Sequence, residues 1–213
     1  MVRRVTKKQR GVIKRRQKKI ILVGAEGNNQ TERNYLMSFN SKQNEYRIII
    51  ADGIHTDPEG VVNDLVKSAK KSELDEDYGD MKVCLMDVDY LKNRKITLQK
   101  AIEISEKENV KLCLSNPCFE IWFLLHYRYS TRQYSSNNEI VKELQQYIPD
   151  YKKSKDIFDT LWPNLDEAIK NAMKLEENHI RNNVKSRLEK IPSSEVYGLI
   201  EILLKDKNKG GDA

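Results

Sequence analysis

The sequence predicts an α/β fold, with a parallel sheet of about four strands and a C-terminal α-helical extension. Apolar strand-like runs alternate with helical segments four times within the first 130 residues, a pattern typical of a parallel sheet covered by helices on both faces. The runs are nearly continuous in apolar character, as expected of strands buried on both sides. Beyond residue 130 the pattern becomes helical. We expect a basic, flexible N-terminal arm (1–17), an α/β domain (18–130) and a helical extension (131–213) packed on that domain.

The predicted strands and helices alternate along the domain. The strands cover residues 18–24, 46–50, 82–86 and 110–114. The helices cover residues 31–39, 61–69, 96–109 and 119–127, where apolar residues recur at helical spacing. Asn29 or Thr31 is the expected N-cap of the first helix. Thr56 or Asp57, ahead of Pro58, fits the start of the second.

The extension is predicted from its helical periodicity and its breaks. Helices are expected at 138–147, within 156–177 and at 193–204. Trp162-Pro163 marks a boundary inside the second range, because proline ends or kinks a helix. Ser193 or Ser194 is the expected cap of the last helix.

Composition indicates a globular protein with a heavily charged surface. The chain has 213 residues, 38% hydrophobic and 33% charged, which is enough for one well-buried core. No run approaches the roughly 18 apolar residues of a membrane span, and no apolar signal region follows the basic start. The three cysteines form no C-x-x-C pair, which disfavours zinc and favours a reducing cytoplasm.

Positive charge is concentrated at the N-terminus. Residues 1–19 contain ten Lys or Arg and no acid, so the remainder carries 28 basic and 32 acidic residues, a net charge of −4. Such an arm is either a disordered, solubilising segment or a segment that binds nucleic-acid phosphates with salt-sensitive affinity. The charge run alone leaves both interpretations open.

Four carboxylates follow three of the predicted strands. Glu26 comes after the first strand, Asp87 and Asp89 after the third, and Glu120 after the fourth. Residues two apart on a strand face the same side, and the carboxyl ends of parallel strands are where α/β proteins bind ligands. Clustered carboxylates favour a divalent cation such as Mg²⁺. Glu26 and Glu120 could instead stabilise the N-termini of the helices that follow them.

Several segments together resemble the RloB family of bacterial defence proteins. They read IILVGAEGNNQTERNY, HTDP, VCLMDVDYLKN, KLCLSNPCFEIWFLLHY and PSSEVYGLIEILL. The resemblance implies a Rossmann-like TOPRIM (topoisomerase–primase) domain, in which Glu26 matches the general acid/base and Asp87 and Asp89 match the metal-binding pair. Glu120 belongs to a family-specific motif. Where the family's first loop commonly has an acid and a lysine, this chain has Asn29 and Gln30.

The leading functional hypothesis is a Mg²⁺- or Mn²⁺-dependent nuclease that cleaves DNA or RNA in anti-phage defence of the abortive-infection type. Glu26, Asp87 and Asp89 would hold the metal, with Glu120 as a further catalytic candidate. The side chains expected to contact nucleic acid are Arg15, Arg16, Lys18, Lys19, His55, Lys92, Arg94 and Lys95.

The alternative is a non-catalytic or partner-activated sensor or effector subunit that works with an ATPase. The chain has no G-x-x-x-x-G-K-[ST] loop of its own for ATP hydrolysis. Primase-like synthesis would use the same metal site and stays open at this stage, as does assembly into a homo-oligomer. No membrane partner is expected.

Overall fold

A five-stranded sheet forms the centre of the protein. The computed structural model describes residues 18–26, 30–42, 44–90 and 92–205, with the side chains of 92 and 93 also outside the description. The strands lie in the order β2-β1-β3-β4-β5. Their bounds are β1 Lys19–Ala25, β2 Tyr46–Ile50, β3 Met81–Asp87, β4 Val110–Asn116 and β5 Ser193–Ser194. The first four are parallel, and β5 is antiparallel to β4. The α/β fold class and the four parallel strands are therefore confirmed.

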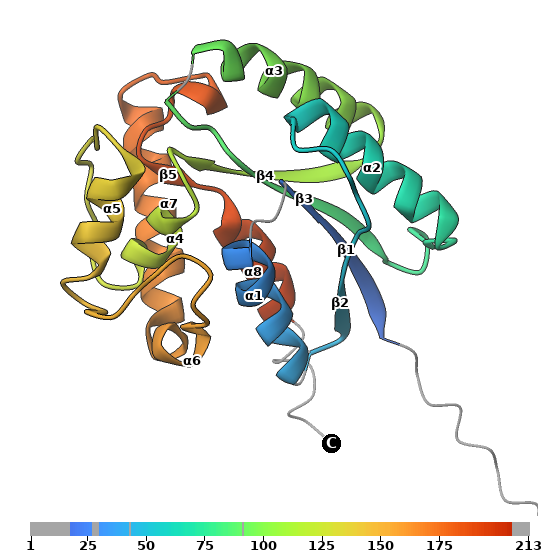
Figure 1. Ribbon diagram of the computed structural model, residues 1–213, viewed down its shortest axis with the longest axis horizontal. Helices are drawn as coiled ribbons and strands as arrows, with labels where there is room; N and C mark the ends of the chain where they lie inside the picture. Colours follow the sequence, from blue (N-terminus) through green and yellow to red (C-terminus); the bar gives the residue numbers. More distant parts are fainter. Residues whose placement is uncertain (1–17, 27–29, 43, 91, 206–213) are drawn as a thin grey trace, which may run out of the picture.

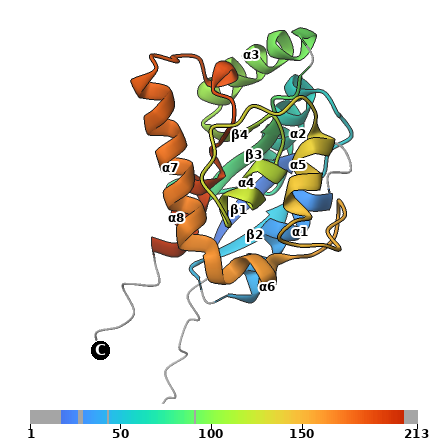
Figure 2. The same ribbon diagram turned by 90° about the vertical axis from the view of Figure 1, so that its left-hand side faces the viewer.

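Helices cover both faces of this sheet (Figures 1 and 2). Their bounds are α1 Gln30–Ser38, α2 Pro58–Lys71, α3 Lys92–Lys107, α4 Glu120–Leu125, α5 Asn137–Leu144, α6 Phe158–Leu161, α7 Leu165–Arg181 and α8 Val196–Lys205. Short 3₁₀ segments lie at Phe39–Ser41, Trp162–Asn164 and Arg187–Glu189. Helices α2 and α3 pack on one face, and α1, α4, α7 and α8 contribute to the core on the other.

Strand side chains alternate between these two cores. In β3, Val83 and Leu85 join the core shared with α1 and α4, whereas Cys84 and Met86 join the core under α2 and α3. A strand turns successive side chains to opposite faces. Asp87, two residues beyond Leu85, therefore belongs to the α1–α4 side of the sheet.

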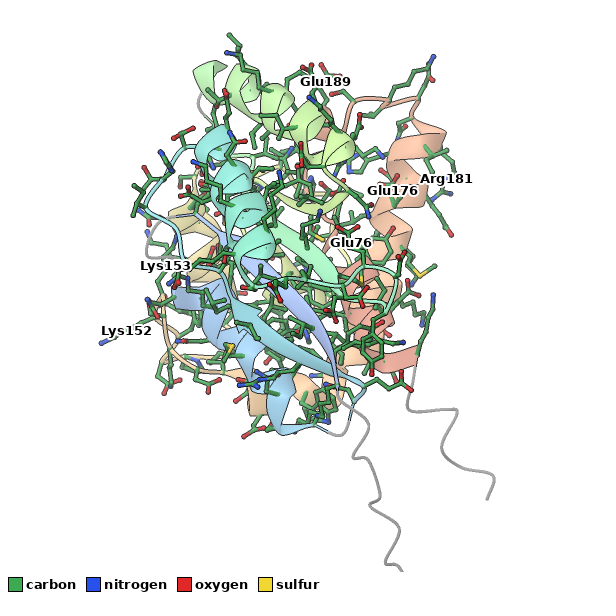
Figure 3. The ribbon with its side chains drawn as sticks, turned by 90° about the vertical axis from the view of Figure 1, so that its right-hand side faces the viewer. Glu76, Lys152, Lys153, Glu176, Arg181 and Glu189 are labelled. Carbon is green, nitrogen blue, oxygen red and sulfur yellow. The ribbon has the colours of Figure 1, made fainter. Side chains whose placement is uncertain are left out.

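The segment between α5 and α6 lies against α1. Ser154 donates its backbone N–H to Thr31 Oγ1 at 3.0 Å, and its carbonyl accepts a hydrogen bond from Asn34 at 2.9 Å. Figure 3 shows Lys152 and Lys153 of this segment beside α1, well away from Arg181 at the end of α7. These contacts bring part of the predicted helical extension next to the end of β1.

One predicted helix cap is wrong, and one of the two alternatives at another is excluded. Thr31 lies inside α1 and accepts its hydrogen bond from Ser154, so it is not an N-cap, and Asn29 lies outside the described residues. Ser193 and Ser194 pair with β4 as β5, and the last helix begins only at Val196. The predicted cap at Asp57 is confirmed, since its side chain accepts from the Gly60 amide. The break at Trp162-Pro163 is confirmed by the 3₁₀ segment that precedes α7.

None of the helices in the described ranges is both long enough and apolar enough to cross a membrane. Cys84, Cys113 and Cys118 are free and buried, so they pack as small core residues.

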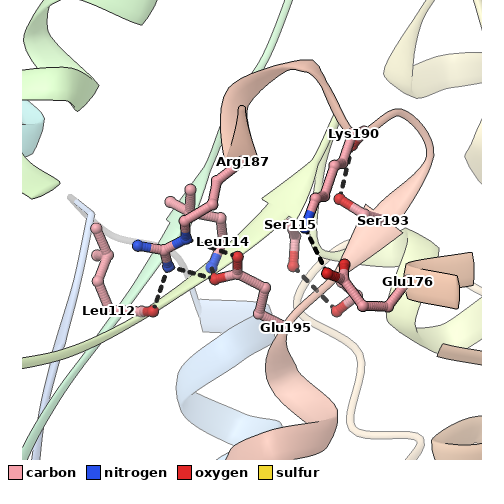
Figure 4. Close-up of polar contacts among 9 residues, drawn as sticks. Leu112, Leu114, Ser115, Glu176, Arg187, Lys190, Ser193 and Glu195 are labelled. Carbon is pink, nitrogen blue, oxygen red and sulfur yellow. Dashed lines mark hydrogen bonds and ion pairs between the residues drawn. The ribbon is translucent and has the colours of Figure 1, made fainter. Parts of the chain in front are cut away.

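At both edges of the sheet, side chains form hydrogen bonds with backbone N–H and C=O groups of the strands. At β4, Glu195 donates its amide to the Leu114 carbonyl and accepts from the Leu114 amide through Oε2, each at 2.9 Å. Arg187 donates to the Leu112 carbonyl and to Glu195 Oε1, each at 2.8 Å (Figure 4). At β2, the Asn40 amide pairs with both backbone polar groups of Ile48, at 2.8 and 2.9 Å. Glu195 and Arg187 thus continue the pairing of β4 beyond the two-residue β5, and Asn40 does the same for the outer edge of β2.

We expect Glu195→Ala to destabilise the fold by about 2–3 kcal/mol, because it leaves the Leu114 amide and the Arg187 guanidinium without their shared acceptor. Urea unfolding followed by circular dichroism measures the loss. Glu177→Ala on the exposed side of α7 is the matched control, with an expected change within about 0.5 kcal/mol. A loss at Glu195 no larger than the control would contradict the edge-pairing role.

Candidate functional site

The candidate site lies where the chain leaves β1 and β3 in opposite directions. After β1 the chain passes to α1 on one face of the sheet, and after β3 it passes to α3 on the other (Figure 1). In open α/β sheets the crevice at such a point, outside the carboxyl ends of the strands, is the usual ligand site. Glu26 directly follows β1, and Asp87 ends β3. The topology thus places these acids at the same end of the sheet.

Arg94, in the first turn of α3, joins these acids. Its Nη2 contacts both carboxylate oxygens of Glu26. Its Nε lies 3.3 Å from Asp89 Oδ2 and donates to the Asp87 carbonyl at 2.9 Å. A guanidinium that meets a carboxylate with both oxygens is a strong, oriented contact. Glu26 and the end of β3 therefore converge on one cation.

The backbone fixes Asp89 in this arrangement. Its φ of +57° lies in the left-handed region, which Asp tolerates better than most residues. Its amide donates to the Pro117 carbonyl at 2.9 Å, which ties it to the turn after β4. Asn137, the first residue of α5, donates to Asp89 Oδ1 at 3.3 Å. Strand β3, the β4 turn and the helical extension thus position one carboxylate together.

Asp87 lies among other carboxylates. Burial raises its pKa well above the usual value, and the charges of Glu32, Glu120, Asp89 and Glu26 raise it further. Within the described ranges, its carboxylate forms no hydrogen bond or ion pair. The negative charge of Asp87 is consequently the least neutralised among the carboxylates of the site.

Two of these neighbours are themselves buried. Glu32 in α1 is 5% exposed and Glu120 at the start of α4 is 2% exposed. Burial raises the pKa of Glu32 to about 7, and the charges of Glu120 and Glu26 add to the increase. Burial also raises the pKa of Glu26, although Arg94 opposes that change. The site therefore holds excess negative charge that protons or a cation would relieve.

Glu120 is held by the segment that follows α5. Tyr151, fully buried, donates its hydroxyl to Glu120 Oε1 at 3.3 Å, and Lys153 Nζ lies 3.6 Å from the same oxygen. Burial would lower the pKa of Lys153, but the charge of Glu120 keeps it raised. Glu120 also occupies the first turn of α4, so the favourable interaction with the helix N-terminus is available to it.

A family model described as RloB-like protein matches residues 21–203 of the chain. The chain belongs to the RloB-like family. The matched range begins in β1 and ends in α8, so it includes the RloB-like protein's four predicted acids and also Lys153. No curated protein and no solved structure gives a significant match.

The carboxylates of this RloB-like protein are suitable donors for a hard divalent cation. Mg²⁺ commonly takes one or two carboxylates and keeps several waters, a requirement that Asp87 and Asp89 can meet. Arg94 now contacts Glu26 and Asp89, and among the described side chains no three or more acids, histidines or cysteines converge as a ready metal cage. The carboxylate oxygens are therefore the right type of ligand for Mg²⁺, and Arg94 competes with such an ion for Glu26 and Asp89.

The predicted nucleic-acid contacts are dispersed. Arg15 and Arg16 lie outside the described residues, as does the side chain of Lys92. Lys18 is exposed and Lys19 lies 3.3 Å from Glu45 at the amino end of β1, the opposite end from Glu26. Lys95 is exposed on α3. Only Arg94 and His55 lie near the carboxyl edge of the sheet with described partners.

Sequence reasoning missed several residues that surround the acids. Glu32 could have been recognised, because Thr31, Glu32, Tyr35 and Leu36 form one buried stripe of α1 and a carboxylate in such a stripe is unusual. No comparable pattern marks Asn137, Tyr151 and Lys153. They reach the RloB-like site only through the packing of the extension on the sheet.

Proposed function

We propose that this RloB-like protein is a Mg²⁺- or Mn²⁺-dependent nuclease of the TOPRIM type that acts in the cytoplasm in anti-phage defence. The observation that carries the proposal is the meeting of Glu26 with the Asp87–Asp89 segment at Arg94, beside an uncompensated Asp87. Family membership supports it, as does the arrangement of Glu after β1 and D-x-D after β3.

Each acid receives a distinct role in this proposal. Asp87 and Asp89 hold the divalent ion, which supplies charge neutralisation at the scissile phosphate. Glu26 accepts or donates the proton of the attacking or leaving oxygen. Burial raises its pKa above the usual value, while Arg94 opposes the change, and the upward direction favours a proton-transfer group, which works best with a pKa near the working pH. Glu120, bound by Tyr151 and Lys153, shapes the negative field from the α4 side.

In the metal-free protein, Arg94 offsets the negative charge of the site. It neutralises Glu26 and Asp89 when no divalent ion does so. A guanidinium also matches the geometry of a phosphate. We therefore assign Arg94 to the substrate phosphate, and Asp87 and Asp89 would hold the divalent ion.

Cleavage assays test the proposal. The purified full chain should degrade at least one of labelled DNA, RNA or transfer RNA when Mg²⁺ or Mn²⁺ is present, and should lose that activity in excess chelator. Cleavage that persists undiminished in chelator would contradict the metal-dependent mechanism.

The same Arg94 contacts favour a second candidate, a partner-activated effector subunit. In this case Arg94 keeps Glu26 and Asp89 occupied until an ATPase partner binds. The chain alone should then be inert with every substrate and gain metal-dependent cleavage when a neighbouring ATPase is added. Equal activity with and without the ATPase would exclude this alternative.

A further inference from the structure

A small hollow lies beside the candidate site, at the carboxyl ends of β1 and β2. Its lining includes Gly24 and Ala25 of β1, Gly53 and His55 of the turn after β2, and Arg33 of α1. We propose that this β1–β2 hollow binds a phosphate group of the nucleic acid. This phosphate is the neighbour, in the same strand, of the phosphate at which cleavage occurs. The inference rests on the proposed function, because it names a substrate contact of the same site.

Arg33 is the cation of the hollow. Its Nε is buried and has no hydrogen-bond partner among the residues that the structure describes. A guanidinium N–H removed from water without an acceptor is unfavourable, and an anion bound where Arg33 lines the hollow would offset that cost through its charge. The planar guanidinium of Arg matches two phosphate oxygens better than it matches a single carbonyl oxygen or a water.

His55 is held at the rim of the hollow by Asp64. Asp64 Oδ2 lies 2.8 Å from His55 Nδ1 and accepts the backbone amides of Ile54 and His55 at 2.9 and 3.1 Å. Burial alone would raise the pKa of Asp64, but these hydrogen bonds keep it below its usual value. An ionised carboxylate only accepts, so Nδ1 carries the hydrogen. In the protonated imidazolium Nε2 also carries a hydrogen, and this nitrogen, without a partner in the described part of the chain, can donate it to a phosphate oxygen.

Two glycines make room for the His55–Asp64 pair. A Cβ on Gly60 would lie 2.5 Å from His55 Cβ, and a Cβ on Gly53 would lie 3.1 Å from Asp64 Oδ2. Any larger residue at position 60 would displace the imidazole. The turn after β2 is thus built around one orientation of His55.

The hollow and the acidic site are neighbours along the chain. Ala25 lines the hollow and immediately precedes Glu26, and Arg33 immediately follows Glu32 in α1. Consecutive residues are only about 3.8 Å apart, so adjacent phosphates of one strand can reach both places. Asp52 also lines the hollow, but it is exposed, and solvent and salt screen its charge. Contacts of this kind position the backbone without reading bases.

Binding measured in excess chelator tests the inference without requiring cleavage. The probe is a short fluorescent single-stranded oligonucleotide, and the readout is its affinity over a series of salt concentrations. Arg33→Gln should weaken binding and reduce the slope of log K against log salt by about 1, as expected for one lost phosphate contact. Arg33→Lys should keep the slope and lose part of the affinity. Asp52→Asn should tighten binding at the low-salt end of the series, where the exposed charge of Asp52 is least screened.

Arg47→Gln is the matched control, since Arg47 is an exposed arginine near the amino end of β2. Thermal unfolding checks that each variant is folded. If Arg33→Gln and Arg47→Gln give the same affinity and slope, or if the wild-type chain binds no oligonucleotide, the inference is overturned. An Arg33 effect without any cleavage in the separate nuclease assay would instead overturn the proposed function alone.

Oligonucleotides with and without a 5′-phosphate distinguish the source of the bound group. Loss of affinity confined to the phosphorylated probe would assign the hollow to a strand end. Equal loss for both probes would assign it to an internal phosphodiester.

Discussion

Asp87→Asn is expected to abolish divalent-dependent cleavage while leaving the fold intact. Even partners outside the first coordination sphere of a metal typically change affinity or activity roughly 10- to 100-fold, so a direct ligand should cost at least about 100-fold. The substitution keeps the size of the side chain but removes the charge that the cation requires. Initial cleavage rates with Mg²⁺, measured on the best substrate of the wild-type protein, test this.

Stability separates this loss from unfolding. Burial and four neighbouring acids raise the pKa of Asp87, so the ionised side chain opposes folding at neutral pH. Asp87→Asn should therefore keep or raise the unfolding temperature of the metal-free protein. Asp166→Asn on the exposed side of α7 is the control and should cleave normally. Wild-type rates in Asp87→Asn would remove Asp87 from the mechanism.

The stability that Glu32 contributes to the metal-free protein should fall as the pH rises from about 4.5 to about 7. Glu32 has a usual pKa of 4.5 and a pKa of about 7 in the folded protein. Between these values the folded state binds more protons than the unfolded state, so stability falls as the pH increases. Burial changes the pKa of Asp87 and of Glu26 in the same direction. Urea unfolding in chelator at several pH values measures the slope.

Glu32→Gln should flatten this dependence and stabilise the protein most at the alkaline end. Mg²⁺ should oppose the loss in the wild-type chain, by about 2.7 kcal/mol when present at 100 times its dissociation constant. Glu167→Gln on exposed α7 serves as the control. An identical pH slope in wild type and Glu32→Gln would show that Glu32 is not the titrating group.

The sequence predicted those parts of the site that depend on strand ends alone. Glu26, Asp87 and Asp89 follow parallel strands, and carboxyl ends of such strands meet at one edge, so their convergence could be expected before the fold was known. Arg94 was expected on the nucleic-acid backbone, yet it contacts the acids. A Lys or Arg in a helix three residues or more beyond a strand can point toward the acids or toward the substrate. Sequence spacing does not decide between these two directions.

Contacts that depend on distant packing were beyond sequence reasoning. Lys153 reaches Glu120 because the segment after α5 lies on α1 through Ser154. Ser193 and Ser194 resemble a helix cap in sequence but complete the sheet, because the edge of β4 is exposed to them in the fold. Local patterns predict elements, whereas these residues acquire their partners only when separate elements meet.

The side chains at the two sheet edges also restrict how the protein can assemble. A free edge strand allows another chain to add a strand by backbone hydrogen bonding. In β2, the Asn40 side chain already bonds the backbone N–H and C=O of Ile48. In β4, Glu195 bonds the backbone N–H of Leu114, and Arg187 bonds the carbonyl of Leu112. Strand addition is thereby opposed at these residues. Docking of a second copy or of an ATPase subunit there would depend on helices and loops, where the interface is set by side-chain complementarity and not by main-chain pairing.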